Sequence, residues 1–155
     1  MPINKRLNTV SLFGQGDIAG IALVTNQIVY LFGLATETNF SLPHTFFIHG
    51  IEFCASVCAS PGNDTVGAHL GIFNTNTAMG MLAGGNRLLA SVISYHPGFP
   101  ASFTSPNVVN QLLVRDFIKP FEVKPGESIG IGISGSPAVP NEAFISVNAI
   151  IYYES

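Results

Sequence analysis

Short apolar runs, separated by segments that contain glycine or proline, recur along the whole chain. The runs are rich in Val, Ile, Phe and Tyr, and no window keeps apolar residues at helical spacing between two helix caps. In a strand, every second side chain points to the same face. The pattern therefore predicts an all-β protein of short strands joined by turns.

About eight runs qualify as strands. The clearest one alternates Ile129, Ile131 and Ile133 with Gly130 and Gly132, so that one face is aliphatic and the other is almost bare. In the last run, Ile145, Val147, Ala149 and Ile151 share one face. The predicted strands are residues 21–32, 45–59, 66–74, 87–95, 108–116, 121–123, 129–134 and 143–153.

The segment Lys124-Pro125-Gly126-Glu127 predicts a type II turn, since Pro followed by Gly suits its two central positions. About eight antiparallel strands in two packed sheets define a β-sandwich of jelly-roll type. An immunoglobulin-like sandwich is the alternative, but its Cys…Trp…Cys arrangement is impossible in a chain that has no Trp.

The length of 155 residues fits one domain. We expect residues 1–17 to form an extended N-terminal arm that reaches up to about 55 Å, and residues 18–155 to form the jelly roll. No segment has the length and apolarity to span a membrane, since the longest candidate is broken by Asn26 and Gln27. We also expect no secretory signal, and hence synthesis in a cytoplasm.

Charge is scarce throughout the chain. Charged residues make up 10% of the sequence and the net charge is −3, whereas typical domains have about 25% charged residues. Lys5 and Arg6 are the only adjacent basic residues, so we expect no nucleic-acid partner. A poorly charged surface favours contact with other proteins. A soluble monomer with an uncharged polar surface remains the alternative.

Cysteine and histidine give no metal or cofactor site. Cys54 and Cys58 are about 13 Å apart if they lie on one strand, too far for a disulfide, and we expect two small buried thiols. His44 and His49 point to opposite faces of a regular strand, and the chain lacks the His-x-His pair of metal-binding cupins. Isolated structural or surface histidines are the favoured interpretation.

Catalytic motifs are also missing from the sequence. It has no Gly-x-Ser-x-Gly elbow and no phosphate-binding Gly-x-x-x-x-Gly-Lys loop. We therefore predict no catalytic residues and no enzyme activity. A hydrolase or metal enzyme would need a site built from distant residues such as His69, His96 and Asp116.

Two features suggest binding surfaces. The bare face at Gly130 and Gly132 allows close approach of a neighbouring subunit or of a loop of the same chain, and both options remain open. Tyr95, Phe99 and Phe103 surround a proline-rich loop. If they are exposed, they favour a carbohydrate- or receptor-binding module of a phage fibre or spike. The alternative is a loop packed by its own side chains.

The stretch from Lys119 to Ile131 resembles the late-strand hairpin of viral and tumour-necrosis-factor-like jelly rolls, in which a Pro-Gly-acidic turn precedes an aliphatic strand. In size and composition the chain is similar to the cement, or decoration, proteins of tailed bacteriophage heads. This resemblance implies a virion structural protein on the outer capsid surface, most simply a homotrimer that binds the major capsid protein. The candidate interface residues are Lys5, Arg6, Tyr95, Phe99, Phe103, Gly130 and Gly132.

Overall fold

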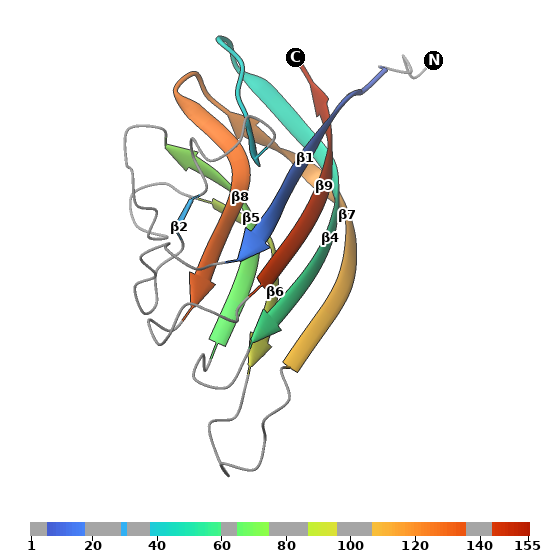
Figure 1. Ribbon diagram of the computed structural model, residues 1–155. Helices are drawn as coiled ribbons and strands as arrows, with labels where there is room; N and C mark the ends of the chain where they lie inside the picture. The colour runs from blue at the N-terminus through green and yellow to red at the C-terminus, as the bar shows by residue number, and fades with distance from the viewer. Residues whose placement is uncertain are drawn as a thin grey trace, which may run out of the picture.

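The computed structural model describes residues 6–17, 29–30, 38–59, 65–74, 87–95, 107–135 and 144–155. These residues form nine strands and no α-helix (Figure 1). Nothing in this part of the chain is a helix long and apolar enough to cross a membrane. The strands are β1 (Asn8–Asp17), β2 (Val29–Tyr30), β3 (Asn39–Phe40), β4 (Phe46–Ala59), β5 (Thr65–Asn74), β6 (Arg87–Tyr95), β7 (Asn107–Val123), β8 (Glu127–Gly135) and β9 (Phe144–Glu154).

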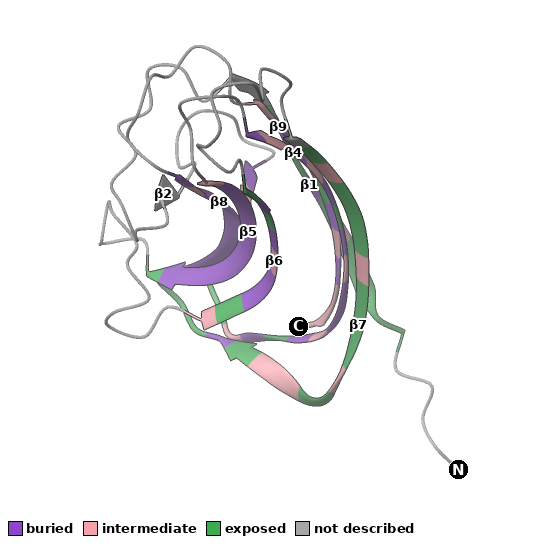
Figure 2. Cartoon of the chain, turned by 90° about the horizontal axis from the view of Figure 1, so that it is seen from below, coloured by how far each residue is buried: buried purple, intermediate pink, exposed green. Residues whose placement is uncertain are grey.

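Two antiparallel sheets contain all of these strands. Sheet A has the order β1-β9-β4-β7, and sheet B has the order β2-β8-β5-β6, with β3 also pairing with β8. From β6 onwards the chain changes sheet at each step, because β7 and β9 belong to sheet A and β8 to sheet B. The two curved sheets face each other (Figure 2). This confirms the predicted two-sheet sandwich of jelly-roll type.

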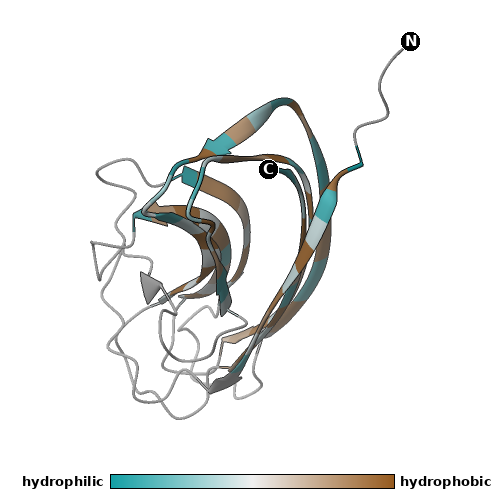
Figure 3. Ribbon diagram, turned by 90° about the horizontal axis from the view of Figure 1, so that it is seen from above, coloured by the Kyte–Doolittle hydropathy of each residue, from teal (hydrophilic) through white to brown (hydrophobic). Residues whose placement is uncertain are grey.

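The core lies between the two sheets. In β4 the burial alternates along the strand, with Phe53, Ala55 and Val57 at most 1% exposed. Burying a Val, Leu, Ile or Phe side chain contributes about 1.5–3 kcal/mol, so these alternating positions hold the sheets together. Figure 3 shows the matching alternation of apolar and polar residues along the strands. The largest fully buried side chains are Leu12, Phe46, Ile48, Ile51, Phe53, Leu70, Ile72, Ile129, Ile131, Ile133 and Ile151.

The outward side of sheet B differs from that of sheet A. In β5 and β8 almost every residue is buried, so both faces of these strands are shielded from solvent. In β4 and β9 only alternate residues are buried, over most of each strand. The face of sheet A that points away from the core is therefore open to solvent in the single chain.

The predicted type II turn is confirmed between β7 and β8. Gly126 has a φ of 88°, which favours glycine at this position. The Glu127 amide donates a hydrogen bond of 3.0 Å to the Lys124 carbonyl. The Glu127 carboxylate accepts hydrogen bonds from the Lys124 amide at 2.9 Å and from Arg87 at 2.8 Å. The hairpin is thereby fixed to the start of β6.

The predicted N-terminal arm needs correction. Residues Asn8–Asp17 are an integral edge strand, paired with β9 along their whole length. The alternation was missed because Gly14, which packs against Ile131, supplies no apolar side chain after Val10 and Leu12. Arg6 and Leu7 precede β1, and residues 1–5 lie outside the described part.

Strand β7 is longer than predicted. The expected runs 108–116 and 121–123 form one strand, with an irregularity opposite residues 48–50 of β4. Phe117 and Phe121 form an edge-on ring pair with centroids 4.7 Å apart, which packs this irregular stretch. Of the expected strand 21–32, the described part contains only β2.

Candidate functional site

The outer face of sheet A carries a region without any charged side chain, which we call the uncharged patch. Its centre is a row across all four strands, in which strand register places Phe13, Asn148, Cys54 and Leu112 side by side. Neighbouring rows extend it. The patch consists of Phe13, Gln15, Cys54, Ser56, Cys58, Val108, Asn110, Leu112, Ser146 and Asn148, and it ends at the next row, in which Glu52 lies between Ile150 and Val114.

Large apolar side chains in this patch are well exposed. Phe13 is 47% exposed, Val108 51% and Leu112 61%. Of the ten exposed large hydrophobic residues in the described part, six belong to strands of sheet A, namely Phe13, Phe47, Val108, Leu112, Val114 and Ile118. Exposed apolar groups gathered on one face of a sheet mark an interaction surface more strongly than scattered ones.

Among the described strands, β7 lies at an edge of sheet A and borders the patch. Residues 107–114 of β7 contain no charge and no proline, whereas Arg115, Asp116, Lys119 and Pro120 follow in the second half. Charges, prolines and bulges are the devices by which edge strands avoid pairing with other chains. Only the second half of β7 has them, so the uncharged patch continues to an unprotected sheet edge.

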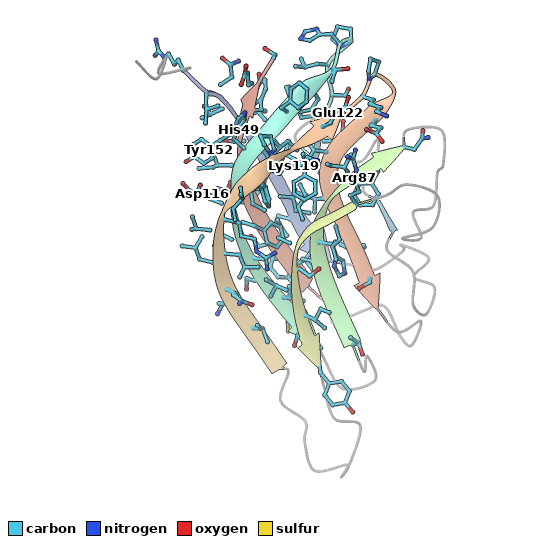
Figure 4. The ribbon with its side chains drawn as sticks, turned by 180° about the vertical axis from the view of Figure 1, so that it is seen from behind. His49, Arg87, Asp116, Lys119, Glu122 and Tyr152 are labelled. Atoms are coloured by element: carbon cyan, nitrogen blue, oxygen red, sulfur yellow. The ribbon has the colours of Figure 1, made fainter. Side chains whose placement is uncertain are left out.

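The other end of the same face is charged. Tyr152 donates a hydrogen bond of 2.5 Å to Oε1 of Glu52. This bond raises the pKa of Tyr152, and burial and the negative charges of Glu52 and Asp116 add to the effect. Nε2 of His49 lies 3.3 Å from Oε2 of Glu154. Figure 4 labels His49, Tyr152 and Asp116 in this region, together with Lys119 and Glu122 of β7.

A second polar cluster, which we call the His69 bridge, lies on the outward side of sheet B. His69 of β5 is only 4% exposed. Its Nδ1 is 2.8 Å from Oγ of Ser91 on β6, and its Nε2 is 2.6 Å from Oγ of Ser134 on β8. The imidazole thus connects three neighbouring strands, and both ring nitrogens have a hydroxyl partner.

Local backbone geometry makes room for this bridge. Gly67 pairs with Ser134, and a Cβ at position 67 would lie 2.8 Å from both Nε2 of His69 and Oγ of Ser134. Only glycine therefore fits without displacing the two side chains. Burial lowers the pKa of His69 to about 4. The imidazole is neutral at pH 7, so one ring nitrogen donates and the other accepts.

Those predicted interface residues that the structure describes do not lie together. Arg6 is exposed before β1, at an edge of sheet A, whereas Tyr95 is 60% exposed at the end of β6, an edge of sheet B. Gly130 and Gly132 are buried within the single chain, so they offer no free surface to a neighbouring subunit. Lys5, Phe99 and Phe103 lie outside the described residues.

The expectation of two buried thiols was wrong. Cys54 is exposed and Cys58 is half-buried, and neither forms a disulfide. Strand alternation explains this, because the core positions of β4 are Phe53, Ala55 and Val57, and both cysteines point the other way.

The residues considered for an enzyme site do not converge either. His69 lies in sheet B and Asp116 in sheet A, each on the side that points away from the core, and His96 lies outside the described part. The described ranges contain no group of three or more His, Cys, Asp or Glu residues arranged to hold a metal ion.

Sequence reasoning missed the His69 bridge because its members are far apart along the chain. His69 is separated by 22 residues from Ser91 and by 65 from Ser134. Two signals were present. A histidine interrupts the otherwise apolar run of β5, and Ser134 takes the place of a third glycine after Gly130 and Gly132. Only the strand order β8-β5-β6 shows that these signals concern one site.

Comparison with known proteins does not place the chain in a family. No family model and no curated protein matches the sequence. Among solved structures, the globular domain of a zebrafish complement 1qA protein is similar over 94% of this chain and 96% of its own length, at 11% identity and a TM-score of 0.44.

Two enzymes are similar in part. They are an aminopeptidase from a marine sediment archaeon of the Thaumarchaeota, at 12% identity and a TM-score of 0.38, and a CocE/NonD family hydrolase from Staphylococcus aureus, at 8% and 0.41. Each aligns with 96% of this chain, which spans 33% and 37% of their respective lengths. These likenesses carry no argument about function.

Proposed function

We propose that this chain is a structural subunit of a larger protein assembly, which binds copies of itself and a partner through surface contacts and performs no catalysis in that role. The uncharged patch on the outer face of sheet A is the observation that supports this proposal. A sheet face with Phe13, Val108 and Leu112 exposed resembles the apolar centre of a protein interface more than the surface of a monomer.

In its specific form, the proposal is a capsid decoration protein. The resemblance to phage cement proteins suggests a homotrimer on the outer surface of a virion, with the major capsid protein as its partner. Specific interfaces bury about 800 Å² on each partner, and a patch that crosses all four strands of sheet A has room for such a contact. Exposed Arg6, just before β1, suits an acidic surface on the capsid.

Self-association is tested by placing one charge in the patch. Leu112→Glu places a carboxylate at a site that is 61% exposed, where the free subunit tolerates it and an apolar interface does not. Ile93→Glu on β6, at a site that is 53% exposed, is the matched control outside the patch. Sedimentation velocity at micromolar concentration should show an oligomer for the unmodified chain and for Ile93→Glu, and a monomer for Leu112→Glu. A monomeric unmodified chain would refute self-association.

Capsid binding needs a separate experiment. The purified chain should co-sediment with capsids that lack decoration protein, at a fixed ratio to the capsid subunits. Absence of binding to any such capsid, together with an intact oligomer, would remove the decoration role and leave the oligomer unaffected.

A carbohydrate- or receptor-binding module is the second candidate. It is favoured by the exposure of Tyr95, which is 60% exposed and lies on the same strand as the exposed Ile93. A glycan array with the unmodified chain and Tyr95→Ala tests it. Binding that disappears in Tyr95→Ala supports this candidate, and no glycan binding by the unmodified chain removes it.

A further inference from the structure

The His69 bridge has the arrangement of a nucleophile, a base and an orienting group. Oγ of Ser134 lies 2.6 Å from Nε2 of His69, and Nδ1 of the same ring lies 2.8 Å from Oγ of Ser91. Both distances fall in the range of about 2.6–3.2 Å in which a positioned base takes a proton from a hydroxyl nucleophile. The three groups come from three adjacent strands, so the sheet itself holds their spacing.

The ring is neutral and can accept a proton, but burial lowers its pKa to about 4 and so makes it a weak base. A neutral imidazole carries one N–H and one lone pair. When Nδ1–H donates to Ser91, Nε2 is left to accept the hydroxyl proton of Ser134. In this tautomer Ser91 accepts the hydrogen bond from Nδ1–H and holds the ring orientation, which is a task of the third member in hydroxyl–imidazole triads.

We propose that Ser134 is a nucleophilic serine that accepts an acyl group from an ester, with His69 as its base and Ser91 as a positioning residue. This activity goes beyond the assembly role and does not depend on it. In the acylation step, Oγ of Ser134 forms a bond to the carbonyl carbon of the ester, and its proton passes to Nε2 of His69. The bond from that carbon to the leaving alkoxide oxygen breaks, and His69 returns the proton to this oxygen.

The surroundings allow access to Ser134 while they protect the base. Ser134 is next to the last residue of β8 and is partly exposed, whereas the imidazole behind it is 4% exposed. Gly67 leaves the line between Oγ and Nε2 free, and strand register places Gly132 opposite His69. Reagents in solvent can therefore reach Ser134 through its partly exposed surface, while its Oγ contacts the imidazole.

The nature of the orienting residue, Ser91, limits the expected rate of acylation of Ser134. Ser91 has no negative charge, so it stabilises an imidazolium less than the aspartate of a Ser-His-Asp triad does. The reaction should therefore be slow and is best detected as stoichiometric modification of Ser134. A fluorophosphonate suits this test, because the serine oxygen displaces fluoride at phosphorus and the adduct persists.

The experiment incubates the native full chain with a fluorophosphonate and locates adducts by intact mass and peptide mapping. We expect a single adduct on Ser134, none on the chain unfolded in urea, and a rate that is constant from pH 8 to 6 and falls only towards pH 4. His69→Gln keeps a polar group but removes the base, so it should slow labelling about 100-fold or more. Ser91→Ala should slow labelling without removing it.

The matched control is Ser11→Ala, which removes an exposed hydroxyl on sheet A and should change nothing. Circular dichroism and urea unfolding verify that each variant is folded. The proposal is overturned if the native unmodified chain gives no adduct on Ser134, or if folded His69→Gln is labelled at the unmodified rate. The first of these outcomes needs only the unmodified chain. The test therefore still decides the proposal if a variant fails to fold.

Discussion

Acidification between pH 6.5 and pH 4 should destabilise this fold, because the buried His69 resists protonation. In the folded chain, burial lowers the pKa of His69 to about 4 from its ordinary 6.5. Between these two values the unfolded chain binds a proton that the folded chain does not. The free energy of unfolding therefore falls as the pH falls from 6.5 towards 4, and the full contribution is present above pH 6.5.

The size of the effect follows from the shift. A change of one pKa unit corresponds to about 1.4 kcal/mol, so the shift of His69 amounts to about 3 kcal/mol between neutral pH and pH below 4. At pH 5 the unfolded form is almost fully protonated and the folded form is mostly neutral, which gives a loss of about 2 kcal/mol. This is a large share of a typical domain stability of about 5–15 kcal/mol.

Urea unfolding at pH 7.5 and at pH 5.0, at constant ionic strength and one protein concentration, measures this loss. His69→Gln cannot titrate, so its stability should depend less on pH by about 2 kcal/mol over the same interval. His44→Gln, at an exposed position, is the control and should keep the dependence of the unmodified chain. If His69→Gln and the unmodified chain lose the same stability between the two pH values, the reasoning is refuted.

Three further results are expected. Gly67→Ala places a Cβ 2.8 Å from Nε2 of His69 and from Oγ of Ser134, so it should lower the free energy of unfolding by about 1–3 kcal/mol. Gly14→Ala is the comparison, because its Cβ would lie 3.4 Å from Ile131. It should lower the free energy of unfolding, measured with urea, far less than Gly67→Ala does. Gly126→Ala should lower the free energy of unfolding by about 1–2 kcal/mol, because φ at this position is 88°. Gly126→Asn should lower it less. Equal losses for the two variants in thermal unfolding would contradict a backbone cause. Cys54 should react faster than Cys58 with an alkylating reagent in dilute solution and should become protected as the concentration rises. Unchanged reactivity would argue against contact at the uncharged patch.

Much of the fold was predictable because it depends on local alternation. The isoleucines of β8 and the Pro125-Gly126 turn were read correctly, since period-two burial and a positive φ leave direct marks in sequence. Strand β1 was missed because Gly14 breaks its apolar alternation, and burial of Cys54 was wrongly expected because composition says nothing about which face a residue takes.

The candidate sites were less accessible to sequence reasoning. The uncharged patch depends on which strands are neighbours, and Phe13 and Leu112 are on opposite edge strands of sheet A. The His69 bridge likewise needs the order of β8, β5 and β6. Low charge predicted contact surfaces, but strand order and register are needed to locate a candidate for one.

Because only the second half of β7 carries charges and a proline, we expect its first half to be the place where strands of other molecules pair when the protein is concentrated or partly unfolded. An open sheet edge adds strands from other molecules, and the uncharged residues 107–114 present the backbone N–H and C=O groups of every second residue at this edge. The irregular stretch around Pro120 cannot extend this pairing, because proline lacks the amide proton and the register is already shifted there. Strand pairing along β7 should therefore end at Arg115. The substitution Asn110→Lys should raise the protein concentration at which fibres form.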